Sequence, residues 1–277
     1  MGERGECDRR EKRSSHVPTI EEKGVTPLTA YSSLVLASSP RAYYRFDEIA
    51  GITAFDQTSN KYHGTIKGGV TLQQQNAIIT DYTDYCYLLN GTNGYVALPT
   101  GLKTDGLAAL SIECWFYLTN NTFVNNPFML ANDPNPLSTH IGFRFNVAPA
   151  SDGSGGHFMI GNGTTGVDKV FGRGVYATGQ WNHVVAVYDG TNVLAYVNGL
   201  SDIRTTILMS GTVGTALHPL AIGAYPPASI DFFPGYLDEI AIYPSALSAA
   251  TILNHYNTGN FGRSGITPFP PLIRRNT

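Results

Sequence analysis

Charged side chains are scarce in this sequence. Asp, Glu, Lys and Arg make up 14% of the 277 residues, against about 25% in a typical soluble protein, and the formal net charge is only −3. Without a basic surplus there is no electrostatic reason to expect a nucleic acid as partner. A continuous run of about 18 apolar residues is also missing, so the sequence predicts no membrane-spanning helix.

Cysteine is nearly absent, with three residues at Cys7, Cys86 and Cys114. No two of them have the spacing of a metal-binding pair. Cys86 and Cys114 fall inside predicted strands, where buried free thiols are the favoured interpretation. A Cys86–Cys114 disulfide is the alternative, and it stays open because the sequence does not give the distance between the two residues.

A secretory leader is the third absence. Residues 1–15 carry charge but lack the apolar core of a signal peptide, so we expect no Sec-type export signal. Residues 1–23 hold six acidic and six basic side chains and have little to bury, so this segment should be disordered on its own. We therefore predict a charged N-terminal arm over residues 1–30. Residues 261–277 are rich in proline and predict an extended C-terminal arm.

Short apolar runs separated by glycine and proline fill the rest of the chain. In the clearest pattern, at residues 181–199, two β-branched and aromatic runs flank the turn sequence Asp189-Gly190. Similar runs recur roughly every 8–14 residues, which predicts one all-β domain over residues 31–260. The β structure is expected to continue without interruption from residue 31 to one C-terminal helix. That helix is expected after Ser248, which can cap it, and Gly259 can end it. The expected strands cover residues 42–46, 63–68, 85–89, 95–98, 110–118, 128–130, 141–147, 157–160, 170–176, 182–188, 192–197, 219–222 and 236–243.

Five segments, together with the hairpin at residues 181–199, carry a family resemblance in their order along the chain. They are the aromatic strand that ends in Asp47-Glu48, the loop that begins at Phe55-Asp56, and the segments at residues 88–96, 111–116 and 235–243. With them the chain resembles the laminin-G-like, concanavalin A-like jelly-roll family over roughly residues 31–257. The resemblance implies a concanavalin A-like jelly-roll β-sandwich of two antiparallel sheets, with one short C-terminal helix and extended terminal arms. It does not name a ligand, because this fold hosts many functions.

The same resemblance implies a structural calcium ion between the loop after the first strand and the closing strand. Transferred by motif, its ligands are Asp56, Asn60 and Asp238, whose carboxylate and amide oxygens suit a hard cation. The sequence departs from the family pattern at residues 61–63, where Lys-Tyr-His replaces small polar residues. The alternative therefore stays open that Asp56 caps a turn and that Asp238 accepts hydrogen bonds from backbone amides.

Catalysis is not expected. Laminarinase-type enzymes of this broad fold carry Glu-x-Asp-x-x-Glu on one strand, so that two carboxylates point into one cleft. That pattern occurs at residues 6–11, but it lies in the charged arm beside two arginines and has no strand character. Within the domain the glutamates are Glu48, Glu113 and Glu239, and no two of them share a predicted strand at alternate positions. We therefore predict that the chain is not an enzyme.

Aromatic side chains in loops are candidates for contact with a ligand or partner. Sugars are held by aromatic faces, with Asn and Asp side chains fixing their hydroxyls. Packing of the loops onto the core and burial against another protein are the alternatives, and the sequence leaves all three open. The candidates are Tyr62, Phe123, Tyr225, Phe232 and Phe233.

Two functions are compatible with these observations. The first is a non-catalytic structural or display protein of a virion, as capsid decoration or in a tail, whose terminal arms clasp neighbouring subunits and which also adheres to host glycans. A virion protein is made inside a cell and acts outside it, which fits a lectin-like domain without an export signal. The alternative is a carbohydrate-binding module of a secreted or cell-surface protein. Both place the domain on a virion or an extracellular surface.

Overall fold

The computed structural model describes residues 29–78, 84–120, 122–123, 125–133, 135–149, 155–172, 178–202, 207–225 and 230–260. Apart from residues 29 and 30, both predicted arms lie outside these ranges, and so does Cys7. Among the described residues, no helix is long and apolar enough to cross a membrane.

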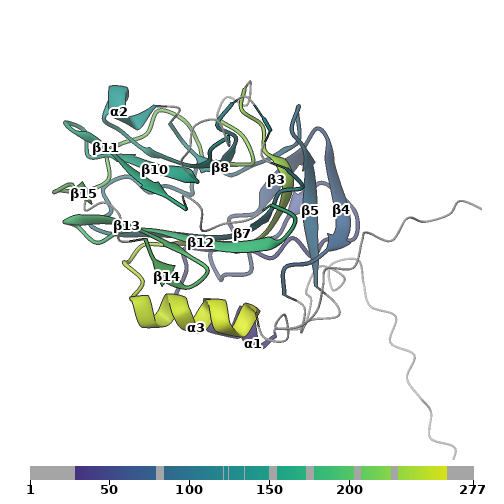
Figure 1. Cartoon of the computed structure of the whole chain (residues 1–277). Helices are drawn as coiled ribbons and strands as arrows, with labels where there is room; N and C mark the ends of the chain where they lie inside the picture. The colour runs from purple at the N-terminus through teal and green to yellow at the C-terminus, as the bar shows by residue number, and fades with distance from the viewer. Residues whose placement is uncertain are drawn as a thin grey trace, which may run out of the picture.

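Two antiparallel sheets face each other and form a β-sandwich (Figure 1). The nine-stranded sheet is named sheet A, and the eight-stranded one is named sheet B. Sheet A runs β14-β13-β12-β7-β17-β5-β4, with β1 beside β17 and β15 beside β13. Its strands are β1 (Ala42–Tyr44), β4 (Val70–Gln75), β5 (Tyr85–Asn90), β7 (Leu110–Tyr117), β12 (Trp181–Tyr188), β13 (Asn192–Val197), β14 (Leu200–Ser201), β15 (Ile207–Leu208) and β17 (Pro234–Tyr243).

Sheet B runs β11-β10-β9-β8-β16-β6-β3-β2. Its strands are β2 (Thr53–Ala54), β3 (Gly64–Lys67), β6 (Tyr95–Ala97), β8 (Phe128–Ala131), β9 (Phe143–Val147), β10 (Gly156–Gly161), β11 (Gly166–Phe171) and β16 (Ala221–Ile222). A short helix, α2 (Pro136–Thr139), connects β8 to β9. The predicted jelly-roll-like sandwich of two antiparallel sheets is thereby confirmed. The strand expected at residues 170–176 overlaps the end of β11, and residues 173–176 lie outside the described part of the chain.

Strand β7 shows how the sequence divides between two apolar layers. Ile112, Cys114 and Phe116 face the main core between the sheets. The alternate residues Glu113 and Trp115 face the opposite side of sheet A, because successive side chains of a strand point to opposite faces. Both faces of β7 are buried, so this strand is apolar nearly throughout.

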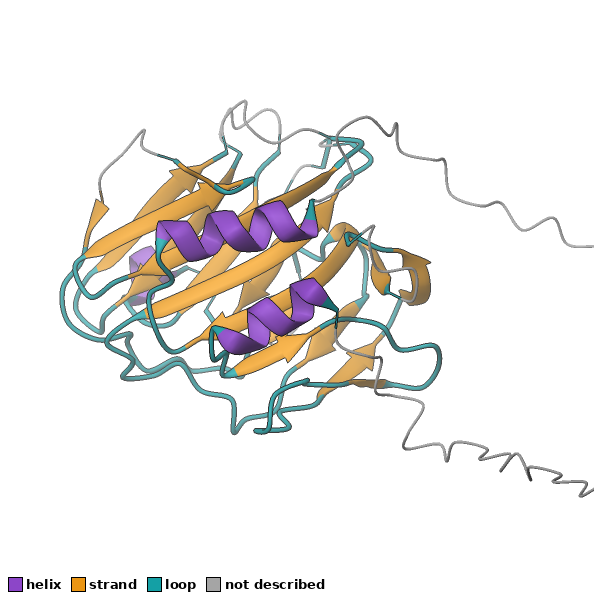
Figure 2. Cartoon of the chain, turned by 90° about the horizontal axis from the view of Figure 1, so that it is seen from below, coloured by secondary structure: helices purple, strands orange, loops and turns teal. Residues whose placement is uncertain are grey.

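Two helices, α1 (Ala30–Ala37) and α3 (Ala249–Gly259), cover the outer face of sheet A. Figure 2 shows them side by side across the strands. Helix α3 confirms the prediction, with the Ser248 side chain accepting a hydrogen bond from the amide of Thr251. The prediction of uninterrupted β structure from residue 31 is wrong, because Thr29 and Ser32 form a capping box that starts α1 there.

The hairpin predicted at residues 181–199 is also confirmed. Strands β12 and β13 pair with Val184 opposite Val197. The carboxylate of Asp189 accepts hydrogen bonds from the amides of Thr191 and Asn192, and Gly190 takes a positive φ of 94°. This turn chemistry fixes the hairpin.

Cys86 and Cys114 are both buried and free, as the favoured interpretation predicted. They lie on β5 and β7, the two strands that flank β17 in sheet A. Two strand spacings correspond to about 9.6 Å, whereas a disulfide needs Cα atoms roughly 4.4–6.8 Å apart. The disulfide alternative is therefore wrong.

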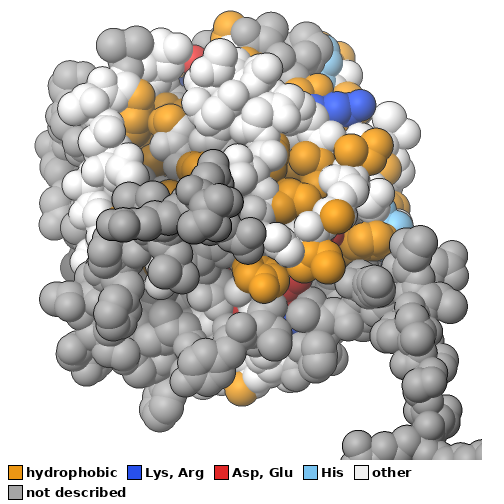
Figure 3. Space-filling view, turned by 90° about the vertical axis from the view of Figure 1, so that its right-hand side faces the viewer, with side chains coloured by type: hydrophobic (Ala, Val, Ile, Leu, Met, Phe, Trp, Pro, Cys, Tyr) orange, Lys and Arg blue, Asp and Glu red, His pale blue; other side chains and the backbone are white. Residues whose placement is uncertain are grey.

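The low charge of the sequence is visible on the surface. Figure 3 shows the face that carries β4 and β5, and in its described part the charged side chains are few. Hydrophobic side chains lie among polar ones there without forming one continuous patch.

Candidate functional site

The structure does not bring the three predicted calcium ligands together. The carboxylate of Asp56 accepts hydrogen bonds from the amides of Tyr43, Thr58 and Tyr62 and from the Thr58 hydroxyl. Strand β1 lies between Asp56 and Asp238, since Tyr44 pairs with Asp56 on one side and β1 pairs with β17 on the other. The backbones of Asp56 and Asp238 therefore lie on opposite sides of β1. Asn60 is exposed, and its amide nitrogen donates to the carbonyl oxygen of Arg41. These hydrogen bonds favour the alternative that Asp56 organises its own turn, and the calcium set of Asp56, Asn60 and Asp238 stays a prediction.

A different group of carboxylates converges around Asp238. Asp84, Asp238 and Glu239 each place a carboxylate oxygen within 4.8 Å of the others, and all three are buried. We call these three residues the acidic cluster. A β-bulge in β17 makes it possible, because Glu239 takes a positive φ of 51° and the register against β7 shifts after Asp238. Two consecutive carboxylates thereby face the same side of sheet A.

Arg45 is the cation that the structure places at this cluster. Its guanidinium lies 3.0 Å from Oδ2 of Asp47, 3.8 Å from Oε1 of Glu239 and 3.9 Å from Oδ1 of Asp84. With Asp47 included, four carboxylates therefore surround one fixed positive charge. Within the described part of the chain, Oδ1 of Asp84 and Oε1 of Glu239 have no hydrogen-bond partner. An excess of negative charge in a buried site destabilises the folded protein unless bound protons or another cation neutralise it.

The pKa values at the cluster follow this excess of negative charge. Burial raises the pKa of Glu239 to about 8, even though Arg45 acts in the opposite direction. Burial and the neighbouring Asp238 raise the pKa of Asp84 as well. A divalent cation would favour the ionised form of all three carboxylates, and their oxygens are the ligands that calcium prefers. Asp238 already accepts hydrogen bonds from the amides of Ala77 and Glu239, each at 2.8 Å, which is the alternative that the sequence left open for it. Oδ1 of Asp84 and Oε1 of Glu239 are therefore the candidate ligand atoms for a cation at this cluster.

Glu113 lies at a second buried polar site under the helices. Its carboxylate accepts hydrogen bonds from Nε2 of His183 at 2.8 Å and from Nδ1 of His255 at 3.0 Å. It also accepts from the hydroxyls of Tyr31 at 2.9 Å and Tyr243 at 2.6 Å. Tyr31 belongs to α1 and His255 to α3, so one carboxylate ties both helices to the sheet. All four of its hydrogen-bond partners therefore lie inside the protein.

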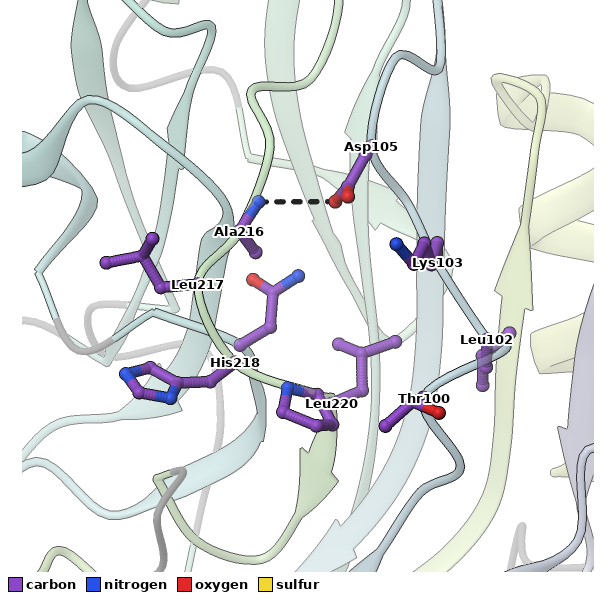
Figure 4. A pocket seen from close by; sticks show the side chains of 10 residues that line it. Thr100, Leu102, Lys103, Asp105, Ala216, Leu217, His218 and Leu220 are labelled. Carbon is purple, nitrogen blue, oxygen red and sulfur yellow. Dashed lines mark hydrogen bonds between the residues drawn. The ribbon is translucent and has the colours of Figure 1, made fainter.

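An open cavity of about 190 Å³ lies at the rim of sheet B, between residues 100–105 and residues 216–220 (Figure 4). We call it the rim pocket. Thr100, Lys103, Asp105, Asn132 and His218 bring polar groups to it. Leu217, which is 74% exposed, Pro219 and Leu220 supply apolar surface.

Hydrogen bonds hold the walls of the rim pocket in place. Oδ1 of Asp105 accepts from the amide of Ala216 at 3.2 Å, which joins the two wall segments, as the dashed line in Figure 4 shows. Asn132 forms the inner end. Its Oδ1 accepts from the amide of Phe143 at 2.8 Å and its Nδ2 donates to the hydroxyl of Thr104. The pocket is therefore built on fixed side chains rather than on a loose loop.

One predicted aromatic residue lies beside the rim pocket. The ring of Tyr225 is half-buried and stands edge-on to His218, with 6.1 Å between the ring centroids. On its other side it contacts Phe128, and the guanidinium of Arg144 lies 5.7 Å from the centre of that ring. A row of rings thus leads from the pocket to β8.

The other four aromatic candidates lie elsewhere. Phe233 is fully buried and packs edge-on against Phe116, so its prediction as a contact residue is wrong. Tyr62 and Phe123 are partly buried and pack against the main core. Phe232 is partly exposed and lies beside Tyr95. Core packing, the alternative that the sequence left open, therefore describes Tyr62, Phe123 and Phe233.

The family of the chain follows from a comparison with known families. Residues 90–253, more than half of the chain, match a laminin G family described as "Concanavalin A-like lectin/glucanases superfamily". The chain belongs to this superfamily. The resemblance carried by the sequence motifs is thus confirmed. Among curated protein sequences, none matches the chain.

Solved structures with this fold include domains that bind sugars or receptors. Domain 4 of an extracellular arabinanase from Geobacillus stearothermophilus, solved with arabinotriose, is similar at 22% identity and a TM-score of 0.57, over 78% of this chain and 98% of that domain. The binding domain of botulinum neurotoxin serotype D is similar at 12% identity and a TM-score of 0.61, over 81% and 53% of the two chains. This superfamily member spans about half the length of such neurotoxin domains. At these identities the likeness concerns the fold.

Asp238 was among the calcium ligands predicted from the sequence, whereas the other residues of the acidic cluster and the polar residues of the rim pocket were not predicted. Arg45 and Asp84 join the acidic cluster from positions with no recognisable metal motif, although Asp47-Glu48 and Asp238-Glu239 were visible as family-like acidic pairs. Lys103, Asp105 and His218 carry no spacing signal, because two loops far apart in the chain build the rim pocket.

Proposed function

We propose that this chain is a non-catalytic carbohydrate-binding module and that the rim pocket binds the sugar. The proposal rests on the side chains that line this pocket. The chain also belongs to a superfamily of lectins and glucanases. The rim pocket combines a carboxylate, an ammonium group, an amide and an imidazole with the exposed apolar surface of Leu217. Sugar hydroxyls both donate and accept hydrogen bonds, whereas the C–H faces of a sugar ring pack on apolar side chains.

The solved relatives support a binding role for this fold. The arabinanase domain was solved with arabinotriose, and the neurotoxin domains are described as receptor-binding domains. The arabinanase is also described as extracellular, which supports a working location outside a cell for this module.

Several observations favour binding over hydrolysis. Glycoside hydrolysis needs two carboxyl groups about 5–9.5 Å apart around the scissile bond. Asp105 is the only carboxylate among the described residues that line the rim pocket. Glu48 and Glu113 are buried and accept internal hydrogen bonds, and Glu239 belongs to the acidic cluster.

A glycan array tests the proposed function. We expect wild-type protein to bind a restricted set of glycans. We expect Lys103→Ala and His218→Ala to lower the affinity about five- to hundredfold, since each removes a polar contact worth roughly 1–3 kcal/mol. Lys67→Ala, which removes an exposed lysine on β3, is the matched control and should bind like wild type. An array without any bound glycan contradicts the proposal, and so does binding that both pocket variants retain.

We also propose that the acidic cluster holds a structural calcium ion. Buried oxygens of Asp84 and Glu239 without hydrogen-bond partners in the described part of the chain, beside Asp238, support it. Its role would be to fix the bulge of β17 against the segment that leads into β5.

The virion role and the clasping of neighbouring subunits by the terminal arms stay predictions. Residues 1–28 and 261–277 lie outside the described residues, and the similar structures do not bear on this role. Deleting residues 1–24 tests it. Loss of association with a particle, with glycan binding unchanged, is the result that this prediction requires.

A further inference from the structure

We infer that the rim pocket accepts the terminal unit of a glycan chain and excludes internal units. This inference rests on the proposed function and specifies which part of a glycan the pocket recognises. It follows from how the two wall segments are joined, from the size of the cavity and from the groups at its inner end.

The two walls are tied together at both ends. At one end the amide of Ala216 donates to Oδ1 of Asp105 at 3.2 Å. At the other end the amide of Leu98 donates to the carbonyl oxygen of Leu220 at 3.0 Å. A groove that binds the middle of a polysaccharide must let the chain enter at one end and leave at the other. Here hydrogen bonds join the two wall segments near both ends of the pocket. Figure 4 shows the one between Asp105 and Ala216.

Asn132 is the buried polar residue of the lining and so marks the inner end of the pocket. This residue is 2% exposed and is fixed by the amide of Phe143 and the hydroxyl of Thr104. Leu102 and Leu220, both also 2% exposed, belong to the same lining. The exposed lining residues, among them Lys103 and Leu217, mark the solvent side, from which a sugar unit would enter.

The size of the cavity leads to the same conclusion. Its volume of about 190 Å³ is below the roughly 300–1,000 Å³ of pockets that take drug-sized ligands. One sugar ring fits such a volume, whereas an oligosaccharide does not. An internal unit has glycosidic bonds at two of its carbons, so the chain would have to leave the pocket at two points. A terminal unit has one such bond and leaves the rest of the chain in solvent.

The polar groups fit a ring that carries free hydroxyls on most sides. Asp105 offers an acceptor, Lys103 and Asn132 offer donors, and His218 offers either role according to its tautomer. These groups reach the cavity from both walls and from its inner end. A terminal unit presents one more free hydroxyl to them than an internal unit does.

Binding to a glycan array tests the inference when the arrayed glycans are grouped by their terminal and internal sugar units. The test does not depend on which sugar the pocket selects. The probes are immobilised glycans in which the same sugar unit stands at the chain end, or at an internal position beneath a different end unit. The bound glycans should share one terminal unit, whatever chain lies below it. The free monosaccharide of that unit should compete about as well as its tetrasaccharide, within roughly threefold.

The failure of this inference and the failure of the proposed function give different results. If no arrayed glycan binds, the proposed function fails and the inference fails with it. If glycans bind through a shared internal unit, or if affinity rises tenfold or more from monosaccharide to tetrasaccharide, only the inference is overturned. Capping the end unit by methylation of its hydroxyls should abolish binding of a glycan that wild-type protein recognises, and retained binding contradicts the inference. Lys67→Ala should behave like wild type in every comparison.

Discussion

Glu113 on β7 and His255 on α3 are joined by a buried hydrogen bond of 3.0 Å between Oε2 and Nδ1. Burial acts to raise the pKa of Glu113, but the charge of His255 and the hydrogen bonds from both histidines hold it well below its ordinary value. Burial acts to lower the pKa of His255, but the charge of Glu113 raises it. The two residues form an ion pair that fastens α3 to sheet A.

Removing this carboxylate should destabilise the domain strongly. In Glu113→Ala, His183, His255, Tyr31 and Tyr243 lose a shared acceptor in a buried site, which corresponds to about 3–5 kcal/mol of unfolding free energy. For a domain of this size we expect the melting temperature to fall by roughly 6–20 °C. Calorimetry measures it. Asp189→Asn, at an exposed hairpin turn, is the control and should cost under about 1 kcal/mol. Equal losses in the two variants would contradict this assignment.

The ion pair also predicts how stability depends on pH. The folded-state pKa of His255 is raised, so its contribution is fully present below its unfolded pKa of about 6.5 and is lost as the pH rises through the raised value. The folded-state pKa of Glu113 is lowered, so its contribution is present above about 4.3 and is lost as the pH falls through the lowered value.

Stability should therefore be highest between about pH 4.5 and 6.5 as far as this pair is concerned. Melting temperatures measured from pH 4 to pH 9 should decline on the alkaline side for wild type, and His255→Gln should flatten that decline. If the alkaline decline is as steep in His255→Gln as in wild type, His255 is not its source.

Calcium should stabilise the protein through the acidic cluster. At a free concentration 100 times the dissociation constant, a bound ion adds about 2.7 kcal/mol, which raises the melting temperature by roughly 5–10 °C. Chelator-treated protein with and without 1 mM calcium gives the comparison. Asp84→Asn should lose the shift, whereas Asp56→Asn should keep it, because Asp56 is not part of the acidic cluster. No shift in wild type, or loss of the shift in Asp56→Asn alone, would refute the assignment.

The thiols of Cys86 and Cys114 should be unreactive in the folded protein. Both are buried, and burial raises the pKa of each thiol well above its ordinary value, so the reactive thiolate is suppressed. In a Cys7→Ser background, a thiol reagent should modify no cysteine under native conditions and two after unfolding. Modification of fewer than two after unfolding without reductant would indicate a disulfide.

Much of the fold was predictable from the sequence because its strands carry strong local patterns. The turn residues Asp189 and Gly190 and the apolar runs beside them determine β12 and β13 almost alone. Strand β4 was missed because its alternate residues are Thr71, Gln73 and Gln75 on an exposed edge, which gives little apolar signal. Helix α1 was missed because its start depends on a local capping box rather than on apolar periodicity.

The sites were less predictable because they depend on distances between segments far apart in the chain. The motif around Asp56 correctly marked an important carboxylate, but its hydrogen bonds organise the loop itself. Whether the Asp238 side chain lies near Asp56 or near Asp84 depends on two features of the fold. They are the side of β1 on which Asp56 and Asp84 lie and the bulge at Glu239. Sequence spacing contains neither fact.

A crystal structure of the protein with its best-binding arrayed glycan tests the proposed sugar site most directly. We predict density for one sugar ring between residues 100–105 and 216–220, with its hydroxyls within hydrogen-bond distance of Lys103, Asp105 or Asn132. The remainder of the glycan should extend into solvent past Leu217. A glycan bound on another surface, with the rim pocket empty of sugar, would contradict the proposal that the rim pocket binds the sugar.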